Sequence, residues 1–129
     1  DAIINEIDNE PTDFICLNFA NPDMVGHTGV YKAVTKALET VDKCTQQVVE
    51  AGLKKDYGFM IIADHGNADF MINNDGTPNT AHTTNLVPCF MLNTDYNKIK
   101  NGKLADIAPT ILKIMGLKIP NDMDGNVLI

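Results

Sequence analysis

The sequence predicts an α/β fold with a mostly parallel sheet, and three stretches of the 129-residue chain carry this prediction. Residues 13–20 and 59–63 are almost continuously apolar, as strands covered on both faces require. Between them, residues 30–51 repeat apolar side chains at helical spacing and turn charged side chains to the opposite face. A strand, a helix and a strand in this order form a right-handed crossover, so the two strands should run parallel.

The remaining elements follow from local signals. Residues 1–9 have the amphipathic pattern of a helix end, and Glu-Pro-Thr at 10–12 should break it. Thr28 is a plausible N-cap for the central helix and Gly52 a plausible residue after its end. Asn-Asn-Asp-Gly at 73–76 predicts a turn in a loop or irregular hairpin. Residues 86–92 predict a strand, and residues 104–115 a short helix that ends before Gly116.

The charge balance excludes some classes of partner. The chain carries 17 acidic side chains against 10 basic ones, a net charge of -7. This argues against nucleic acid or an anionic membrane surface as a partner. No apolar run approaches the roughly 20 residues of a membrane-spanning helix, and no leader segment is present. We therefore expect a soluble chain.

The cysteine pattern bears on the cellular compartment. Cys16, Cys44 and Cys89 are odd in number, form no C-x-x-C pair and lie in apolar or helical stretches. Buried free thiols in a reducing compartment explain this pattern better than a disulfide framework. We expect a cytoplasmic protein.

Two residue types are missing. The chain has no serine, the usual oxygen nucleophile, and no arginine, the preferred clamp for phosphate or carboxylate. A self-contained phosphoryl-transfer or acyl-transfer enzyme without either would be unusual. Because the chain also begins at Asp1 without an initiator methionine, we expect a segment of a longer protein.

All three histidines lie in polar segments next to predicted strands. Asp64 and His65 follow the strand at 59–63, Asp23 and His27 follow the strand at 13–20, and His82 precedes the strand at 86–92. A lone Asp-His pair is more often a helix cap beside a surface histidine, and a D-x-x-x-H spacing alone is a weak signal. Ligands bind beyond the carboxyl ends of parallel strands, so for the three histidines together we favour metal ligation.

The resulting donor set has five members from three loops: Asp23, His27, Asp64, His65 and His82. Five mixed oxygen and nitrogen ligands are too many for one catalytic zinc ion. They suit part of a two-metal centre, whose ions lie roughly 3.5–4 Å apart. Carboxylate and imidazole donors are compatible with Mn²⁺ or Zn²⁺, and no thiolate among them selects zinc.

At these residues the chain strongly resembles the cofactor-independent (2,3-bisphosphoglycerate-independent) phosphoglycerate mutases. Residues 18–29, Asn-Phe-Ala-Asn-Pro-Asp-Met-Val-Gly-His-Thr-Gly, resemble the first metal motif of that family. Residues 63–69, Ala-Asp-His-Gly-Asn-Ala-Asp, resemble the second, and residues 81–88 resemble the third. Residues 106–112 are similar to a segment shared across the wider alkaline-phosphatase-like superfamily.

The resemblance implies a fold and a ligand assignment. The fold is an alkaline-phosphatase-like three-layer sandwich with a mostly parallel sheet, of which residues 1–129 are the C-terminal part of the phosphatase-like domain. Asp23, His27 and His82 would hold one Mn²⁺, and Asp64 and His65 the second with residues from elsewhere. Zn²⁺ or another divalent ion could replace Mn²⁺, and no bisphosphoglycerate would be required.

The resemblance also implies an activity in glycolysis. A serine that ligates the second ion takes the phosphoryl group from 3-phosphoglycerate and returns it to give 2-phosphoglycerate. That serine, a further aspartate ligand and the domain that grips the substrate would precede this chain in its parent protein. The partners implied are phosphoglycerate and the remainder of the parent chain, in an enzyme that works as a monomer. Alone, this chain should be inactive.

Two alternatives stay open at this point. The parent protein could be a metal-dependent phosphatase or phosphodiesterase of the same superfamily, which releases phosphate to water. Alternatively, the chain could be a noncatalytic metal-binding module.

Overall fold

The computed structural model describes residues 1–9 and 12–129. It divides into two compact units, Asp1–Asn93 and Thr94–Ile129, and each is described by itself. Of the breaker expected at residues 10–12, Glu10 and Pro11 lie outside the described residues.

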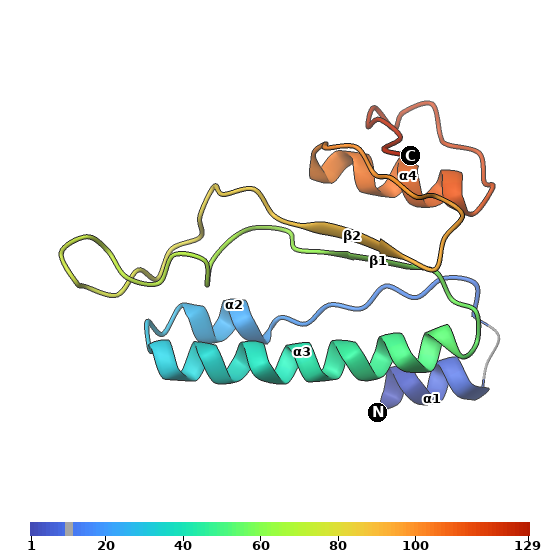
Figure 1. Ribbon diagram of the computed structural model, residues 1–129. Coiled ribbons are helices and arrows are strands. Elements are labelled where there is room, and N and C mark those ends of the chain that lie inside the picture. Colours follow the sequence, from blue (N-terminus) through green and yellow to red (C-terminus); the bar gives the residue numbers. More distant parts are fainter. Residues whose placement is uncertain (10–11) are drawn as a thin grey trace. The chain divides into compact units, whose positions relative to one another are not determined.

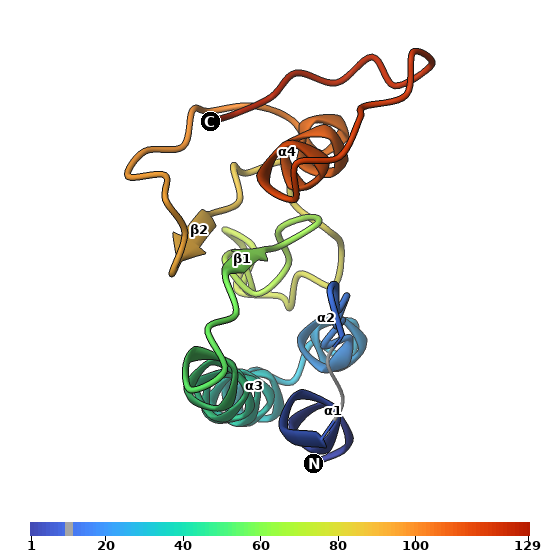
Figure 2. The ribbon, with the colours of Figure 1, turned by 90° about the vertical axis from the view of Figure 1, so that its right-hand side faces the viewer.

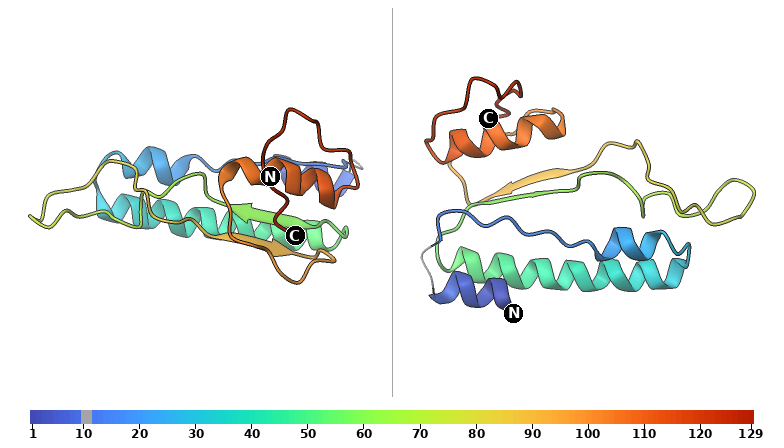
Figure 3. Two further views of the ribbon diagram at one scale, coloured as in Figure 1. Left: turned by 90° about the horizontal axis from the view of Figure 1, so that it is seen from above. Right: turned by 180° about the vertical axis from the view of Figure 1, so that it is seen from behind.

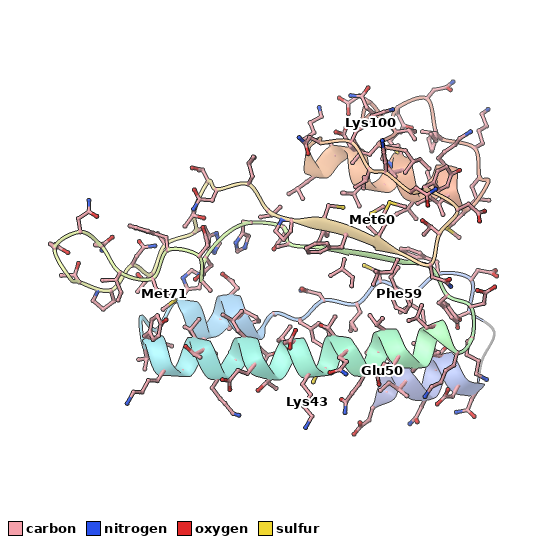
Figure 4. All side chains as sticks on the ribbon, in the orientation of Figure 1. Lys43, Glu50, Phe59, Met60, Met71 and Lys100 are labelled. Atoms are coloured by element: carbon pink, nitrogen blue, oxygen red, sulfur yellow. The ribbon has the colours of Figure 1, made fainter. Side chains whose placement is uncertain are left out.

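The first unit is built along one long helix, α3 (Tyr31–Leu53). The shorter helices α1 (Ala2–Asn9) and α2 (Asn21–Gly26) both pack beside it (Figures 1 and 2). Val34 is buried on α3, whereas Lys43 and Glu50 point away from the strands into solvent (Figure 4). The amphipathic pattern therefore predicted this helix and its exposed face correctly.

The predicted ends of α3 are wrong in detail. Its N-cap is Val30, and the Thr28 hydroxyl instead donates to the Val25 carbonyl oxygen at 2.6 Å. Gly52 lies inside the helix, and the first left-handed residue beyond it is Asp56, with φ of 62°. The lack of a side chain at position 52 makes room for Phe59 instead, because a Cβ there would lie 3.1 Å from Cε2 of that ring.

The strands differ from the predicted arrangement. β1 (Phe59–Ile62) pairs with β2 (Cys89–Leu92), and the two strands run antiparallel (Figure 3). In this register Phe59 lies opposite Leu92. Residues 13–20 are extended but belong to no strand, so the parallel pair expected between residues 13–20 and 59–63 is wrong for the described residues. An apolar run predicts a covered segment, but it does not identify the neighbour that supplies the hydrogen bonds.

The long connection between β1 and β2 contains the expected turn. Gly76 has φ of 84° and donates its N–H to the Asn73 carbonyl oxygen at 2.9 Å. A bridge between Ile72 and Pro78 closes this irregular hairpin, and a second bridge joins Gly66 to Thr83. The second bridge brings the two histidine-bearing ends of the connection together.

The second unit consists of the 3₁₀ turn η1 (Leu104–Asp106), the helix α4 (Ile107–Ile114) and the C-terminal tail. Gly116, with φ of 69°, ends the helix as predicted. The fully buried Thr110 hydroxyl donates to the Asp106 carbonyl oxygen at 2.6 Å and accepts the Leu128 N–H at 3.0 Å. These bonds fasten the tail to the helix.

The prediction of buried thiols is wrong for Cys16, which is exposed, while Cys44 and Cys89 are half-buried. Burial raises the pKa of the Cys89 thiol. Among the described residues, no helix combines the length and the apolar character that crossing a membrane requires.

Candidate metal centre

Helix α2 supplies the first two candidate ligands. Pro22 lies in its first turn, where a missing N–H costs nothing, and Asp23 follows in the same turn. His27 is the C-cap residue, four positions later, so both side chains lie on one side of the helix. Nε2 of His27 lies 3.3 Å from Oδ1 of Asp23.

The loop after β1 supplies the second pair. His65 is partly buried, and its Nε2 lies 4.0 Å from Oδ1 of Asp23. Asp64 is the more peripheral member, because 82% of its side chain is exposed. Its Oδ2 lies 3.7 Å from Nε2 of His65.

His82, near the end of the connection between β1 and β2, completes the cluster. Its Nε2 lies 2.9 Å from Oδ1 of Asp23 and 3.2 Å from Nε2 of His27. Its ring stacks on that of His65, with the ring centroids 3.7 Å apart. One carboxylate oxygen is therefore close to a ring nitrogen of all three histidines.

The structure thus brings four of the five predicted residues into one cluster and leaves the fifth at its edge. Ligand atoms of Asp23, His65 and His82 all lie within 4.8 Å of one another. His27 adjoins two of these, whereas Asp64 reaches the cluster through His65.

The cluster suits a divalent cation chemically. The Thr80 carbonyl oxygen only accepts hydrogen bonds, so Nδ1 of His27, 2.7 Å away, must carry the proton. In the neutral ring Nε2 of His27 then carries a lone pair. This nitrogen faces Nε2 of His82 and Oδ1 of Asp23. When Nε2 of His82 is also unprotonated, two imidazole lone pairs and a carboxylate oxygen converge, and this is a donor set that binds a divalent cation. Imidazole held by a carbonyl is also the usual support of a metal-bound histidine.

The surroundings favour the ionised form of Asp23. Desolvation by itself raises the pKa of this carboxyl. A hydrogen bond from Asn67 lowers it, and so does the positive charge of the three neighbouring histidines when they are protonated; the net result is a pKa below the ordinary value. An ionised carboxylate is the form that binds a cation.

Two residues of the second motif, Asn67 and Asp69, carry roles that the sequence analysis did not assign. Nδ2 of Asn67 donates to Oδ1 of Asp23 at 2.9 Å. Asp69 accepts hydrogen bonds from the Asn85 amide and the Thr83 hydroxyl, and these lower its pKa. In the sequence, the only signal for these two residues was their position a few residues after Asp64. Their hydrogen-bond partners lie far away in the chain, so a local motif does not reveal them.

A hollow of about 360 Å³ adjoins the cluster. It is lined by Phe70, Asn79, His82, Thr83, Thr84 and Asn85. His82 therefore belongs both to the cluster and to the lining of this hollow.

Comparison with known proteins gives a family match over most of the chain. The model of a family described as the metalloenzyme superfamily matches residues 1–119. The 2,3-bisphosphoglycerate-independent phosphoglycerate mutase of Bacteroides thetaiotaomicron is 55% identical over 130 residues, covering 100% of this chain and 26% of that protein. The enzyme of the same name from Clostridium botulinum is 50% identical, with the same two coverages of 100% and 26%. The chain thus spans about a quarter of the length of the curated relatives it matches.

A solved structure is similar over the same extent. A Leishmania mexicana phosphoglycerate mutase, crystallised at low cobalt concentration, matches 99% of this chain and 27% of its own with a TM-score of 0.85. The sequence identity between the two is 27%. The two chains therefore share their fold throughout this segment.

Proposed function

This chain belongs to the metalloenzyme superfamily, and we propose that it forms the later part of the phosphatase-like domain of a 2,3-bisphosphoglycerate-independent phosphoglycerate mutase. The observation that carries the proposal is the meeting of Asp23 and His27, from helix α2 and its C-cap, with His65 and His82 from two separate loops. Similarity to mutases over the full length of the chain supports it. The three-layer sandwich with a mostly parallel sheet belongs to this proposal, as a property of the complete domain.

In this proposal the ligands divide between two ions. Asp23, His27 and His82 hold one ion, which is consistent with the 2.9–3.3 Å separations among their ligand atoms. Asp64 and His65 hold the second, together with residues elsewhere in the parent protein. Mn²⁺ is the ion we favour, because mixed carboxylate and imidazole donors suit it, and Zn²⁺ or Co²⁺ could take its place.

The chemistry follows from this assignment. Bound divalent ions would neutralise charge on a transferring phosphoryl group and lower the pKa of a hydroxyl nucleophile. The residues of this chain hold the site in shape: Thr80 orients the His27 ring, and stacking against His65 orients the His82 ring. Because the chain has no serine and no arginine, the nucleophile and the substrate clamp come from other parts of the parent protein.

The proposed reaction is the interconversion of 3-phosphoglycerate and 2-phosphoglycerate through a phosphoserine, in cytoplasmic glycolysis. The partners are the phosphoglycerate substrate and the remainder of the parent chain, in a monomeric enzyme. The hollow beside His82 offers the substrate an approach to the cluster.

The test is a pair of substitutions in the complete parent protein. His82→Ala and Asp64→Ala should each abolish mutase turnover, measured as 2-phosphoglycerate formed from 3-phosphoglycerate in the presence of Mn²⁺. Asn74→Ala, at an exposed position in the hairpin turn, is the matched control and should leave turnover unchanged. Near-normal turnover in either of the first two variants would contradict the assignment.

The same assay separates the mutase from its hydrolytic relatives. A mutase returns the phosphoryl group to glycerate, so inorganic phosphate should stay at the level of a protein-free blank. Stoichiometric release of phosphate to water would favour the phosphatase alternative.

A further inference from the structure

We propose that Asn67 is a positioning residue for the metal centre, because it holds the carboxylate of Asp23 in the orientation that faces the three histidines. The inference rests on the proposed metal-binding role of Asp23. It adds a residue outside the ligand set, and it explains the glycine at position 26.

Asn67 is a buried residue that makes a hydrogen bond to the ligand set. It is 9% exposed, and its Nδ2 donates to Oδ1 of Asp23 across 2.9 Å. The two residues are 44 positions apart in the sequence, so this bond joins the loop after β1 to helix α2. The donor is buried, whereas 38% of the Asp23 side chain is exposed, so the bond holds a partly solvated carboxylate against a fixed amide.

The bond acts on the atom that organises the cluster. Oδ1 of Asp23 is the oxygen that lies near Nε2 of His27, His65 and His82. A carboxylate turns readily about its last torsion, since sp³–sp² torsions have broad minima. The hydrogen bond from Asn67 restricts this rotation even when no ion is bound. Groups that orient a metal ligand in this way typically change metal affinity 10–100-fold.

Gly26 provides the space in which Asn67 sits. A Cβ at position 26 would lie 2.7 Å from Cγ and 2.9 Å from Nδ2 of Asn67, and it would collide with Oδ1 of the same side chain. Gly26 itself is buried in the last turn of α2, one turn after Asp23. The absence of a side chain at position 26 therefore lets the amide reach the carboxylate.

The first experiment measures Co²⁺ binding to the metal-free parent protein, by visible absorption and by calorimetric titration. Asn67→Leu keeps the shape of the side chain but removes the donor. It should raise the Kd for Co²⁺ by about 10–100-fold at the site whose binding His82→Ala abolishes. Asn93→Ala removes two side-chain hydrogen bonds in the same unit, to Asp56 and Tyr57, and should leave this Kd unchanged.

The second experiment is a double-mutant cycle that distinguishes positioning from a general loss of stability. Gly26→Ala should weaken Co²⁺ binding by displacing the Asn67 amide. In an Asn67→Ala background the new methyl group has room, so Gly26→Ala should cause no further loss. If Gly26→Ala weakened Co²⁺ binding by the same factor in both backgrounds, the inference would be overturned. The effect of Gly26→Ala would then come from helix α2 and not from Asn67.

The outcomes separate the inference from the function on which it rests. Wild-type Co²⁺ affinity in Asn67→Leu, with binding lost in His82→Ala, would overturn the role of Asn67 and leave the proposed function standing. Unchanged Co²⁺ binding in His82→Ala, or none in the wild type, would overturn both. Weaker Co²⁺ binding in Asn67→Leu, together with no further loss from Gly26→Ala in the Asn67→Ala background, would support both.

Discussion

At the scale of single residues, the site depends on one oxygen atom. Oδ1 of Asp23 lies 2.9 Å from Nε2 of His82 and accepts a hydrogen bond from Asn67 at the same distance. The sequence predicts Asp23 as a ligand from its place after an apolar run and its spacing to a histidine. It says nothing of which carboxylate oxygen is used or what holds it.

A second aspartate, Asp106, has a structural role that can be tested by pH. Its carboxylate accepts backbone N–H bonds from Lys103 at 2.9 Å and from Asn126 at 2.7 Å. These bonds, in that order, and to a lesser extent the charge of Lys103, outweigh desolvation and lower the pKa of Asp106 below its ordinary value of 3.8. The ionised carboxylate therefore stabilises the folded chain.

The sign of the pH dependence follows. With a folded-state pKa below 3.8, the contribution of Asp106 is fully present above this value and is lost as the pH falls through the folded-state pKa. Urea unfolding at a series of acidic pH values should show this loss in the wild type. In Asp106→Asn the free energy of unfolding should be lower at neutral pH and should fall less on acidification. Parallel curves for the two proteins would contradict the prediction.

At the scale of elements, the six-residue helix α2 positions two of the candidate ligands. Asp23 lies in its first turn, and His27 is its C-cap residue. Near the end of α3, Gly52 lies against Phe59 of β1. A Cβ at position 52 would collide with Cζ of Phe59, and it would lie 3.1 Å from Cε2 of that ring and 3.3 Å from Cβ of Tyr57.

This contact predicts the effect of Gly52→Ala. Alanine favours a helix interior over glycine by about 1 kcal/mol, but overpacking typically costs about 1–3 kcal/mol. We expect a net loss of about 1 kcal/mol in the free energy of unfolding, measured by urea titration. In a Phe59→Leu background, which lacks the outer ring atoms, the same change should be neutral or stabilising. An equal loss in both backgrounds would show that the ring is not the cause.

At the scale of the whole molecule, the four clustered candidate ligands lie in one unit of the chain, and the chain contains no serine that could act as the proposed nucleophile. Asp23, His27, His65 and His82 all belong to the unit Asp1–Asn93. The 129-residue chain by itself should therefore bind about one equivalent of Mn²⁺ in a calorimetric titration, because its donors already lie together. His82→Ala should abolish this binding. Titration of the chain without heat above dilution would mean that the site forms only with the rest of the parent protein.

The same chain should have no mutase activity, because it has no serine to carry the phosphoryl group. The measurement is 2-phosphoglycerate production by the purified chain, compared with a blank that contains Mn²⁺ alone. Product above the blank would contradict the proposed division of the active site.

The sequence by itself predicted the long helix, the hairpin turn, the C-terminal helix and the identity of the candidate ligands. Helical periodicity identified α3, turn residues identified the hairpin at 72–78, and polar histidine-bearing loops identified the cluster. These features depend on neighbours close in the chain, so local patterns are sufficient to predict them.

Only the tertiary structure decided the pairing of elements and the supports of the site. The apolar run at 13–20 was predicted as a parallel strand, yet β1 pairs antiparallel with β2. The Asn67 bond to Asp23 spans 44 positions, and the bonds of Asp69 to Thr83 and Asn85 span 14 and 16. The apolar run and the polar side chains indicate that partners are needed, but chain folding selects the partners through contacts that no local spacing encodes.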